Sequence, residues 1–145
     1  MKTKILVVAV LVLVGLVLLV NGQQARASIE PITAFDDVFT ELNAGDVDSA
    51  LEWFAEDATA ENKVRSETYR GAAEIRKLLE GMQYAGRKFE IVEVSMNGDT
   101  VTARVEVSDR GHTWGTETIE AVVLGGKVQT FRITAFRLEL WRIGR

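Results

Sequence analysis

Histidine and cysteine, two residues that often carry nucleophilic or metal chemistry, are nearly absent from this 145-residue chain. It contains no cysteine, which removes disulfides, thiol nucleophiles and thiolate metal ligands together. The only histidine, His112, follows Gly111 and lies near Trp114, so it suits either a proton shuttle at a cavity mouth or a solvated surface group. Gly111 and Gly115 lack the third glycine and the strand-to-helix context of a phosphate loop. We therefore expect neither a metal site nor a cofactor.

Aromatic and aliphatic side chains could instead wall a ligand-binding cavity. Tyr69 would offer a hydroxyl group at the wall, and Val122 and Ile133 would add apolar surface. Packing in the core accounts for the same side chains without any ligand, so both interpretations stay open. The aromatic candidates are Trp53, Phe54, Trp114, Phe131 and Trp141.

Three helices are predicted in the first half of the folded domain. Pro31 suits the first helical position, because that residue needs no N–H donor, and Gly45 and Asp46 suit a helix end followed by a new cap. A short strand pair is predicted over residues 58–69. The apolar residues that recur at helical spacing are Ile32, Phe35, Val38, Phe39 and Leu42, then Val47, Ala50, Leu51 and Phe54, then Ile75, Leu78, Leu79 and Met82.

After Gly86 the apolar pattern alternates with period two, which predicts a meander of strands. Turns are expected at 97–99, 109–111 and 125–126, where glycine follows or precedes a short polar residue or a second glycine. The last strand, 128–141, has no proline and is partly apolar on both faces, so we expect a partner subunit behind the sheet. The outer face of this predicted homodimer would carry Phe136, Leu138 and Leu140 along with Val128, opposite a face of Phe131, Ile133, Ala135 and Trp141.

Four motifs along these elements are Leu42-Asn43-Ala44-Gly45-Asp46, Trp53-Phe54-Ala55-Glu56-Asp57-Ala58-Thr59, Tyr69-Arg70-Gly71 before Ala73-Glu74-Ile75, and Gly125-Gly126-Lys127-Val128. Over residues 31 to about 140 the chain resembles the nuclear transport factor 2-like superfamily, in its SnoaL-like and ketosteroid-isomerase-like branches. The resemblance implies an α+β fold, with three N-terminal helices on a strongly curved antiparallel sheet, as a cone-shaped cystatin-like α+β barrel with an apolar cavity. It implies little about function, because this scaffold hosts isomerases, cyclases, dehydratases, epoxide hydrolases and non-enzymatic members.

The resemblance implies three catalytic groups for an isomerase, and two of them are missing when they are matched to this sequence residue by residue. Asn62 follows Ala58-Thr59-Ala60-Glu61, where the resemblance places an aspartate base, and Val38 stands where it places a phenol. Asn62 could still orient a polar ligand atom, or it could simply end a strand at a turn. The third group, a carboxylic acid kept neutral by an apolar site, matches Glu120.

Glu120 therefore has two interpretations. It is either a cavity carboxyl that acts as an acid or base on a ligand, or the structural partner of Arg132 or Arg137 across a hairpin.

Residues 1–27 are predicted to be a targeting segment and residues 28–145 the folded domain. Residues 5–20 form an apolar run without a polar side chain, and this run is just short of the length of a membrane-spanning helix. Ala25 and Ala27 fit a signal-peptidase site. Cleavage after Ala27 would release an exported domain, periplasmic or extracellular. An uncleaved hydrophobic helix over residues 5–20 would instead anchor the domain in a membrane, with the domain outside.

The predicted domain is acidic, with 14 basic and 21 acidic residues and a net charge of −7 after residue 27. Nucleic acid is therefore not an expected partner, because such binding needs lysine and arginine at the phosphates. The leading functional prediction is binding of a hydrophobic small molecule in the cavity. The alternatives are a SnoaL-like lyase, isomerase or hydrolase acting on an apolar substrate, and an anchored protein-interaction module.

Overall fold

The computed structural model describes residues 31–139, which belong to one compact unit that begins at Pro31. The predicted targeting segment, and Leu140 and Trp141 of the predicted last strand, lie outside the described residues. Within the described part, every helix is too short or too polar to cross a membrane.

Three helices form where the apolar spacing predicts them. The first covers residues 31–43, and α2 (Val47–Glu52) and α3 (Gly71–Gln83) follow, with a short 3-10 turn, η1 (Tyr84–Gly86), after α3. Gly45, at φ +80°, ends the first helix, and the Asp46 carboxylate caps α2 by accepting the Ser49 N–H at 2.9 Å. Phe54 was expected in the second helix but opens the first strand, because α2 ends at Glu52.

The sheet has six strands in the order β2-β1-β6-β5-β4-β3. All neighbouring pairs are antiparallel except β1 and β6, which run parallel with Asn62 beside Ile133. The antiparallel sheet that the resemblance implies is therefore present in every neighbouring pair except β1 and β6. The strands are β1 (Phe54–Asn62), β2 (Glu67–Arg70), β3 (Lys88–Asn97), β4 (Thr100–Asp109), β5 (His112–Leu124) and β6 (Lys127–Leu138).

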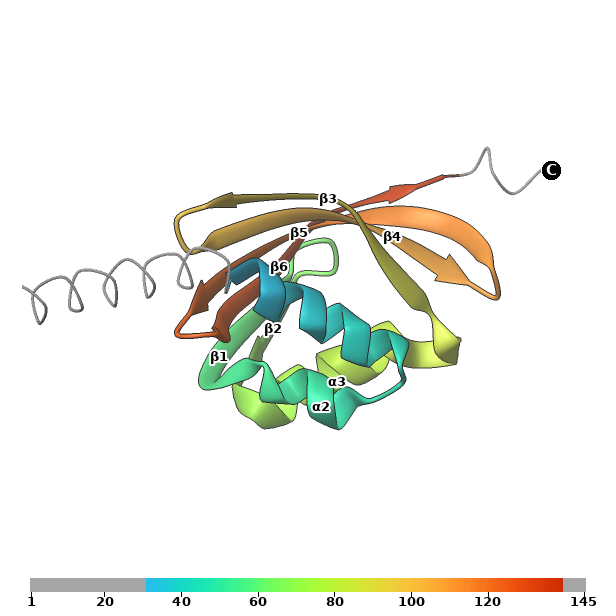
Figure 1. The fold of residues 1–145 in the computed structure, drawn as a ribbon. Helices are drawn as coiled ribbons and strands as arrows, with labels where there is room; N and C mark the ends of the chain where they lie inside the picture. The colour runs from blue at the N-terminus through green and yellow to red at the C-terminus, as the bar shows by residue number, and fades with distance from the viewer. Residues whose placement is uncertain (1–30, 140–145) are drawn as a thin grey trace, which may run out of the picture. The chain divides into compact units, whose positions relative to one another are not determined.

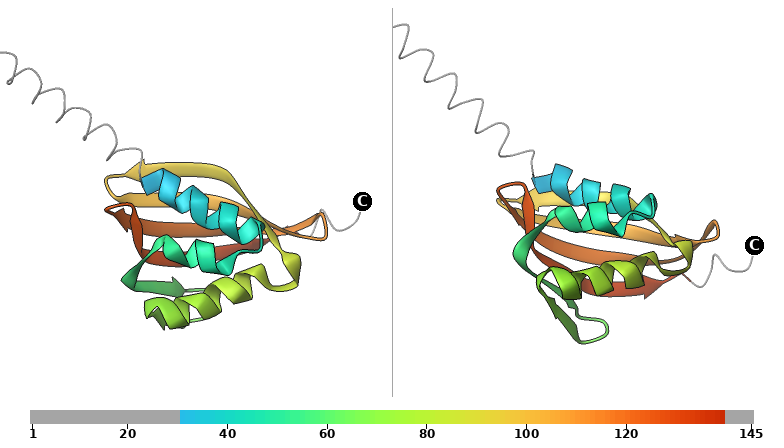
Figure 2. Two further views of the ribbon diagram at one scale, coloured as in Figure 1. Left: turned by 60° about the horizontal axis from the view of Figure 1, so that its bottom comes forward. Right: turned by 90° about the horizontal axis from the view of Figure 1, so that it is seen from below.

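All three helices lie on one face of the curved sheet (Figures 1 and 2). The core between the two layers contains a cluster of phenylalanine rings around Phe131, whose centroid lies 6.3 Å from that of Phe35 and 5.8 Å from that of Phe54. Among the described residues, no polar or charged residue is fully buried. Burial of apolar side chains therefore stabilises the contact between the helices and the sheet.

Two register shifts in β6 change which of its side chains face the helices. Val122 pairs with Thr130 but Val123 pairs with Val128, and Thr118 pairs with Ala135 but Ile119 pairs with Ile133. Each shift inserts one unpaired residue and reverses the alternation beyond it. Side chains expected on opposite faces therefore share the inner face: Val128, Phe131, Ile133 and Phe136.

Polar side chains occupy the middle of the outer face of the sheet. Thr102, Glu120 and Arg132 lie side by side across β4, β5 and β6. The expectation that Phe136 belongs to an apolar outer face is wrong, because its ring lines a cavity on the inner side. The homodimer stays a prediction. The apolar outer face of the last strand, from which it was predicted, lacks Phe136 in the structure.

Candidate functional site

A cavity of about 180 Å³ lies on the inner side of the sheet, between α3, the β1–β2 hairpin and the adjoining ends of β3 to β6. The hairpin side is open, because Val64 and Arg65 of the turn are exposed. Most of the wall is apolar and made of buried or half-buried side chains. These are Leu78, Met82, Phe89, Val107, Ile133 and Phe136.

Glu117 places a carboxyl group in this wall. It lies on β5 between Val105 of β4 and Phe136 of β6, and its Oε2 atom is buried with no hydrogen-bond partner among the described residues. Removal from water raises the pKa of Glu117 to about 7, although the positive charges of Arg87 and Arg65 act in the opposite direction. The carboxyl group can therefore gain or lose a proton near neutral pH.

Trp114 and Arg87 lie at the same wall. The Trp114 ring contacts Phe136, with centroids 5.0 Å apart, and the Arg87 guanidinium carbon lies 4.9 Å from the indole centroid. The indole Nε1 atom is buried and has no hydrogen-bond partner within residues 31–139. The wall thus combines an aromatic surface, a buried N–H donor and a cation held over the ring.

Asn43, at the end of the first helix, fixes the start of β3, which carries Phe89 and follows Arg87. Its side-chain amide donates to the Phe89 carbonyl at 2.7 Å, and its Oδ1 atom accepts the Phe89 N–H at 2.8 Å. This reciprocal pair connects the first helix to the strand edge that would otherwise be free there. The Asn43 side chain thus fixes the backbone two residues after Arg87, which lines the cavity.

Asn62 and Tyr69 lie at the open side of the cavity. Asn62 Oδ1 accepts the Arg65 N–H at 3.2 Å, so the side chain both closes the β1–β2 turn and lines the cavity. The Tyr69 hydroxyl donates to Glu67 at 2.6 Å, and this hydrogen bond is the main cause that raises the pKa of Tyr69. Tyr69 is accordingly neutral at physiological pH and directs its proton to Glu67.

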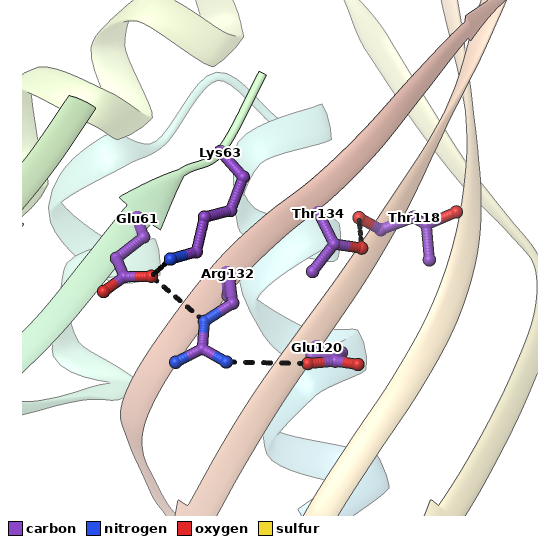
Figure 3. Close-up of polar contacts among 6 residues, drawn as sticks. All are labelled: Glu61, Lys63, Thr118, Glu120, Arg132 and Thr134. Carbon is purple, nitrogen blue, oxygen red and sulfur yellow. Dashed lines mark hydrogen bonds and ion pairs between the residues drawn. The ribbon is translucent and has the colours of Figure 1, made fainter. Parts of the chain in front are cut away.

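Glu120 does not lie in the cavity. Its side chain is 45% exposed and its Oε2 atom lies 3.8 Å from Arg132, which also binds Glu61 at 3.1 Å (Figure 3). The interpretation of Glu120 as a cavity carboxyl is therefore wrong. The structure instead shows the alternative, in which Glu120 pairs with Arg132. The inward carboxyl belongs to Glu117, three residues earlier, which shares its face with Ile119.

The remaining predicted site residues divide between the cavity and other places. Trp114, Ile133, Asn62 and Tyr69 line the cavity. Four others do not: His112 is exposed at the start of β5, Val122 lies on the outer face, Trp53 packs at the edge of the core, and Phe131 is inside the phenylalanine cluster. The sequence did contain a signal for Glu117, because it alternates with Ile119, Ala121 and Val123, which are all buried.

Metal binding finds no support in the part of the chain that the structure describes. Residues 31–139 contain no group of three or more histidine or acidic side chains close enough to hold a metal ion. The side chains of the cavity wall themselves offer proton exchange at Glu117 and hydrogen-bond donors at Trp114 and Arg87.

Solved structures with a similar fold come from several bacteria. An NTF-2 like protein of unknown function from Burkholderia xenovorans LB400 is 17% identical, with a TM-score of 0.64 over 81% of this chain and 94% of that one. An LEH-like epoxide hydrolase of M. tuberculosis is 20% identical, with a TM-score of 0.60 over 78% and 85%. An uncharacterized cystatin fold protein from Novosphingobium aromaticivorans is 18% identical, with a TM-score of 0.60 over 73% and 96%. At these identities the likeness shows the fold alone.

No curated protein matches the sequence. The sequence profile of the SnoaL-like domain does match, over residues 35–138, which span the first helix to the last residue of β6. That stretch is most of the chain and contains the complete cavity wall. The profile and the fold agree with the resemblance seen in the sequence motifs, and this chain belongs to the SnoaL-like domain family.

Proposed function

We propose that this domain binds a small, largely apolar molecule in the cavity beneath α3, with one polar group of the ligand at Glu117. The observation that carries the proposal is the pair of buried polar atoms without partners, Glu117 Oε2 and Trp114 Nε1. A buried polar group without a hydrogen bond costs about 1–3 kcal/mol. A ligand that supplies the missing partners recovers this free energy on binding.

The size of the cavity limits the ligand. Its volume of about 180 Å³ is below the ~300–1,000 Å³ of pockets for drug-sized molecules. An apolar cavity of ~150 Å³ holds a single benzene ring. The proposed ligand is therefore a single-ring or short-chain molecule, and a fused-ring ligand would protrude through the open hairpin side into solvent.

Calorimetric titration with single-ring probes tests this proposal. Benzyl alcohol and benzoate are suitable, because both have one ring and one polar group. At least one of them should give a saturable heat and change the tryptophan fluorescence. Replacing Trp114 by phenylalanine should remove most of the fluorescence change, while Trp53→Phe, at the edge of the core away from the cavity, should keep it. Absence of saturable binding by every single-ring probe would refute the proposal.

A second candidate function is acid–base catalysis on such a molecule, as a lyase, isomerase or hydrolase. The observation that favours it is the pKa of about 7 at Glu117, since a catalytic acid or base works best when its pKa lies near the working pH. Turnover, if found in a substrate screen, should fall by at least a hundredfold in Glu117→Gln and be unchanged in Glu120→Gln, whose side chain pairs with Arg132. Equal losses in the two variants would exclude Glu117 as the catalytic group.

We also propose that the domain works outside the cytoplasm, on the support of the apolar run at residues 5–20 and the small residues Ala25 and Ala27. The chain isolated from an expressing cell should begin at Ser28 and leave the membrane in a carbonate wash. Intact mass and N-terminal sequencing measure this directly. A membrane-bound chain that retains Met1 would favour the anchored alternative.

A further inference from the structure

The charges around the cavity are predominantly positive, although the domain as a whole is acidic. Three cations line the cavity, Arg65, Lys77 and Arg87, against the two carboxyl groups of Glu67 and Glu117. Glu67 already accepts a hydrogen bond from the Tyr69 hydroxyl group. A protonated Glu117 leaves the wall with more positive than negative charge.

Arg87 is the best placed of these cations to meet a ligand. It is half-buried, its guanidinium carbon lies 4.9 Å from the Trp114 centroid, and it forms no ion pair with any carboxylate within residues 31–139. An arginine stacked on a ring keeps its N–H donors in the plane of the guanidinium, where they can bind a carboxylate with two hydrogen bonds. The buried Trp114 N–H is a further donor at the same wall.

We propose that the cavity selects a single-ring or short-chain carboxylate, whose anionic group accepts hydrogen bonds from Arg87 and Trp114 and from the protonated carboxyl group of Glu117. This inference rests on the proposed function and adds the chemical class of the ligand. The ring or chain occupies the apolar wall beside Phe136 and Met82. The carboxylate satisfies all three polar groups at once.

Other ligand classes fit these groups less well. An amine would need an ionised Glu117 and would be repelled by Arg65 and Arg87. A neutral alcohol or ketone could accept the Trp114 N–H but would leave the Arg87 charge without a counter-charge. Selectivity for the carboxylate therefore comes from the half-buried guanidinium.

Binding of an anion is coupled to protonation of Glu117. The groups that face Glu117 across the cavity are Arg65 and Glu67 from the hairpin, Lys77 from α3 and Arg87 before β3, together with the Tyr69 hydroxyl, whose pKa is raised above its ordinary value. An anion beside Glu117 favours its neutral form, so binding takes up a proton. With a pKa of about 7 in the free protein, the protonated fraction falls about tenfold between pH 6 and pH 8, and the affinity should fall by the same factor.

Calorimetry with benzoate, benzyl alcohol and benzylamine on the purified protein tests this inference. Benzoate should bind more tightly than the other two at pH 6, lose about tenfold in affinity at pH 8, and take up protons when titrated in two buffers of different ionisation enthalpy. Glu117→Gln should remove the pH dependence. Arg87→Gln should remove the preference for benzoate, and the matched control Arg104→Gln, which breaks an ion pair with Glu93 on β3, should change neither.

The outcomes separate this inference from the proposed function. Binding of benzyl alcohol or benzylamine with equal or higher affinity than benzoate at pH 6 would overturn the carboxylate inference and leave the cavity a binding site. Benzoate binding that is the same at pH 6 and pH 8 would also overturn it. If none of the three probes binds, the proposed function fails together with the inference.

Discussion

Gly115 controls the position of the aromatic wall, and replacing it by alanine should both destabilise the domain and reduce the cavity. A Cβ atom at this position would lie 2.3 Å from Cζ of Phe136 and 2.9 Å from the Arg137 carbonyl oxygen. To reach an ordinary contact of 3.4 Å, the Phe136 ring must move by just over 1 Å. The backbone of β6 is held by its strand pairing and can shift only slightly, so most of the adjustment falls on the Phe136 ring, which contacts Trp114 and lines the cavity.

Overpacking of this kind costs about 1–3 kcal/mol in the free energy of unfolding. Urea denaturation followed by tryptophan fluorescence measures that loss, and the emission of the folded state should shift because Phe136 contacts Trp114. Affinity for single-ring probes should fall in the same variant. Gly81→Ala is a control for stability alone, because Gly81 also lines the cavity: its new methyl group on α3 meets no atom within 4 Å, and alanine should stabilise the helix by about 1 kcal/mol. A Gly115→Ala protein with wild-type stability and fluorescence would refute the assigned packing.

Three further predictions follow from burial and charge. The folded-state pKa of Glu117 is raised from 4.5 to about 7, so the wild-type domain should lose up to about 3 kcal/mol of stability between pH 4.5 and pH 7 relative to Glu117→Gln, as measured by urea denaturation at each pH. Phe131→Ala should lower the free energy of unfolding by about 3–5 kcal/mol, because it empties the centre of the phenylalanine cluster. Glu120→Gln should change it by less than about 1 kcal/mol, because the ion pair with Arg132 is half exposed. A large effect of Glu120→Gln would contradict its position on the outer face. Light scattering at micromolar concentration should report the mass of a dimer, as predicted from the last strand. A monomer mass would refute the predicted homodimer.

Local patterns in the sequence were sufficient for most of the fold. Helical spacing located the buried face of the first helix, and the glycines at 98, 111, 125 and 126 adopt the positive φ that their turns require. The parallel pairing of β1 with β6 was missed, because it joins residues more than 60 positions apart and depends on the packing of the whole layer.

The site was harder to predict because it depends on strand register. The two shifts in β6 bring Phe136 to the inner face, and no single residue in that strand marks where a bulge occurs. The family resemblance placed the inward carboxyl at Glu120, and the observed register places it at Glu117, on the alternating face with Ile119. Trp114, Tyr69 and Asn62 line the cavity, and their aromatic or strand-end types are detectable without the register; Ile133 also lines it and was predicted as an apolar residue of the last strand.

Titration of Glu117 tests the proposed binding site itself, because that site depends on a carboxyl group in the cavity wall whose Oε2 atom is buried. Carbon NMR of the side-chain carboxyl groups, with Glu117→Gln to assign the resonance, should give a pKa of about 7 in the free protein and a higher value with benzoate bound. A pKa close to the ordinary 4.5, unchanged by any single-ring ligand, would show that Glu117 is solvated and would contradict the proposed binding site.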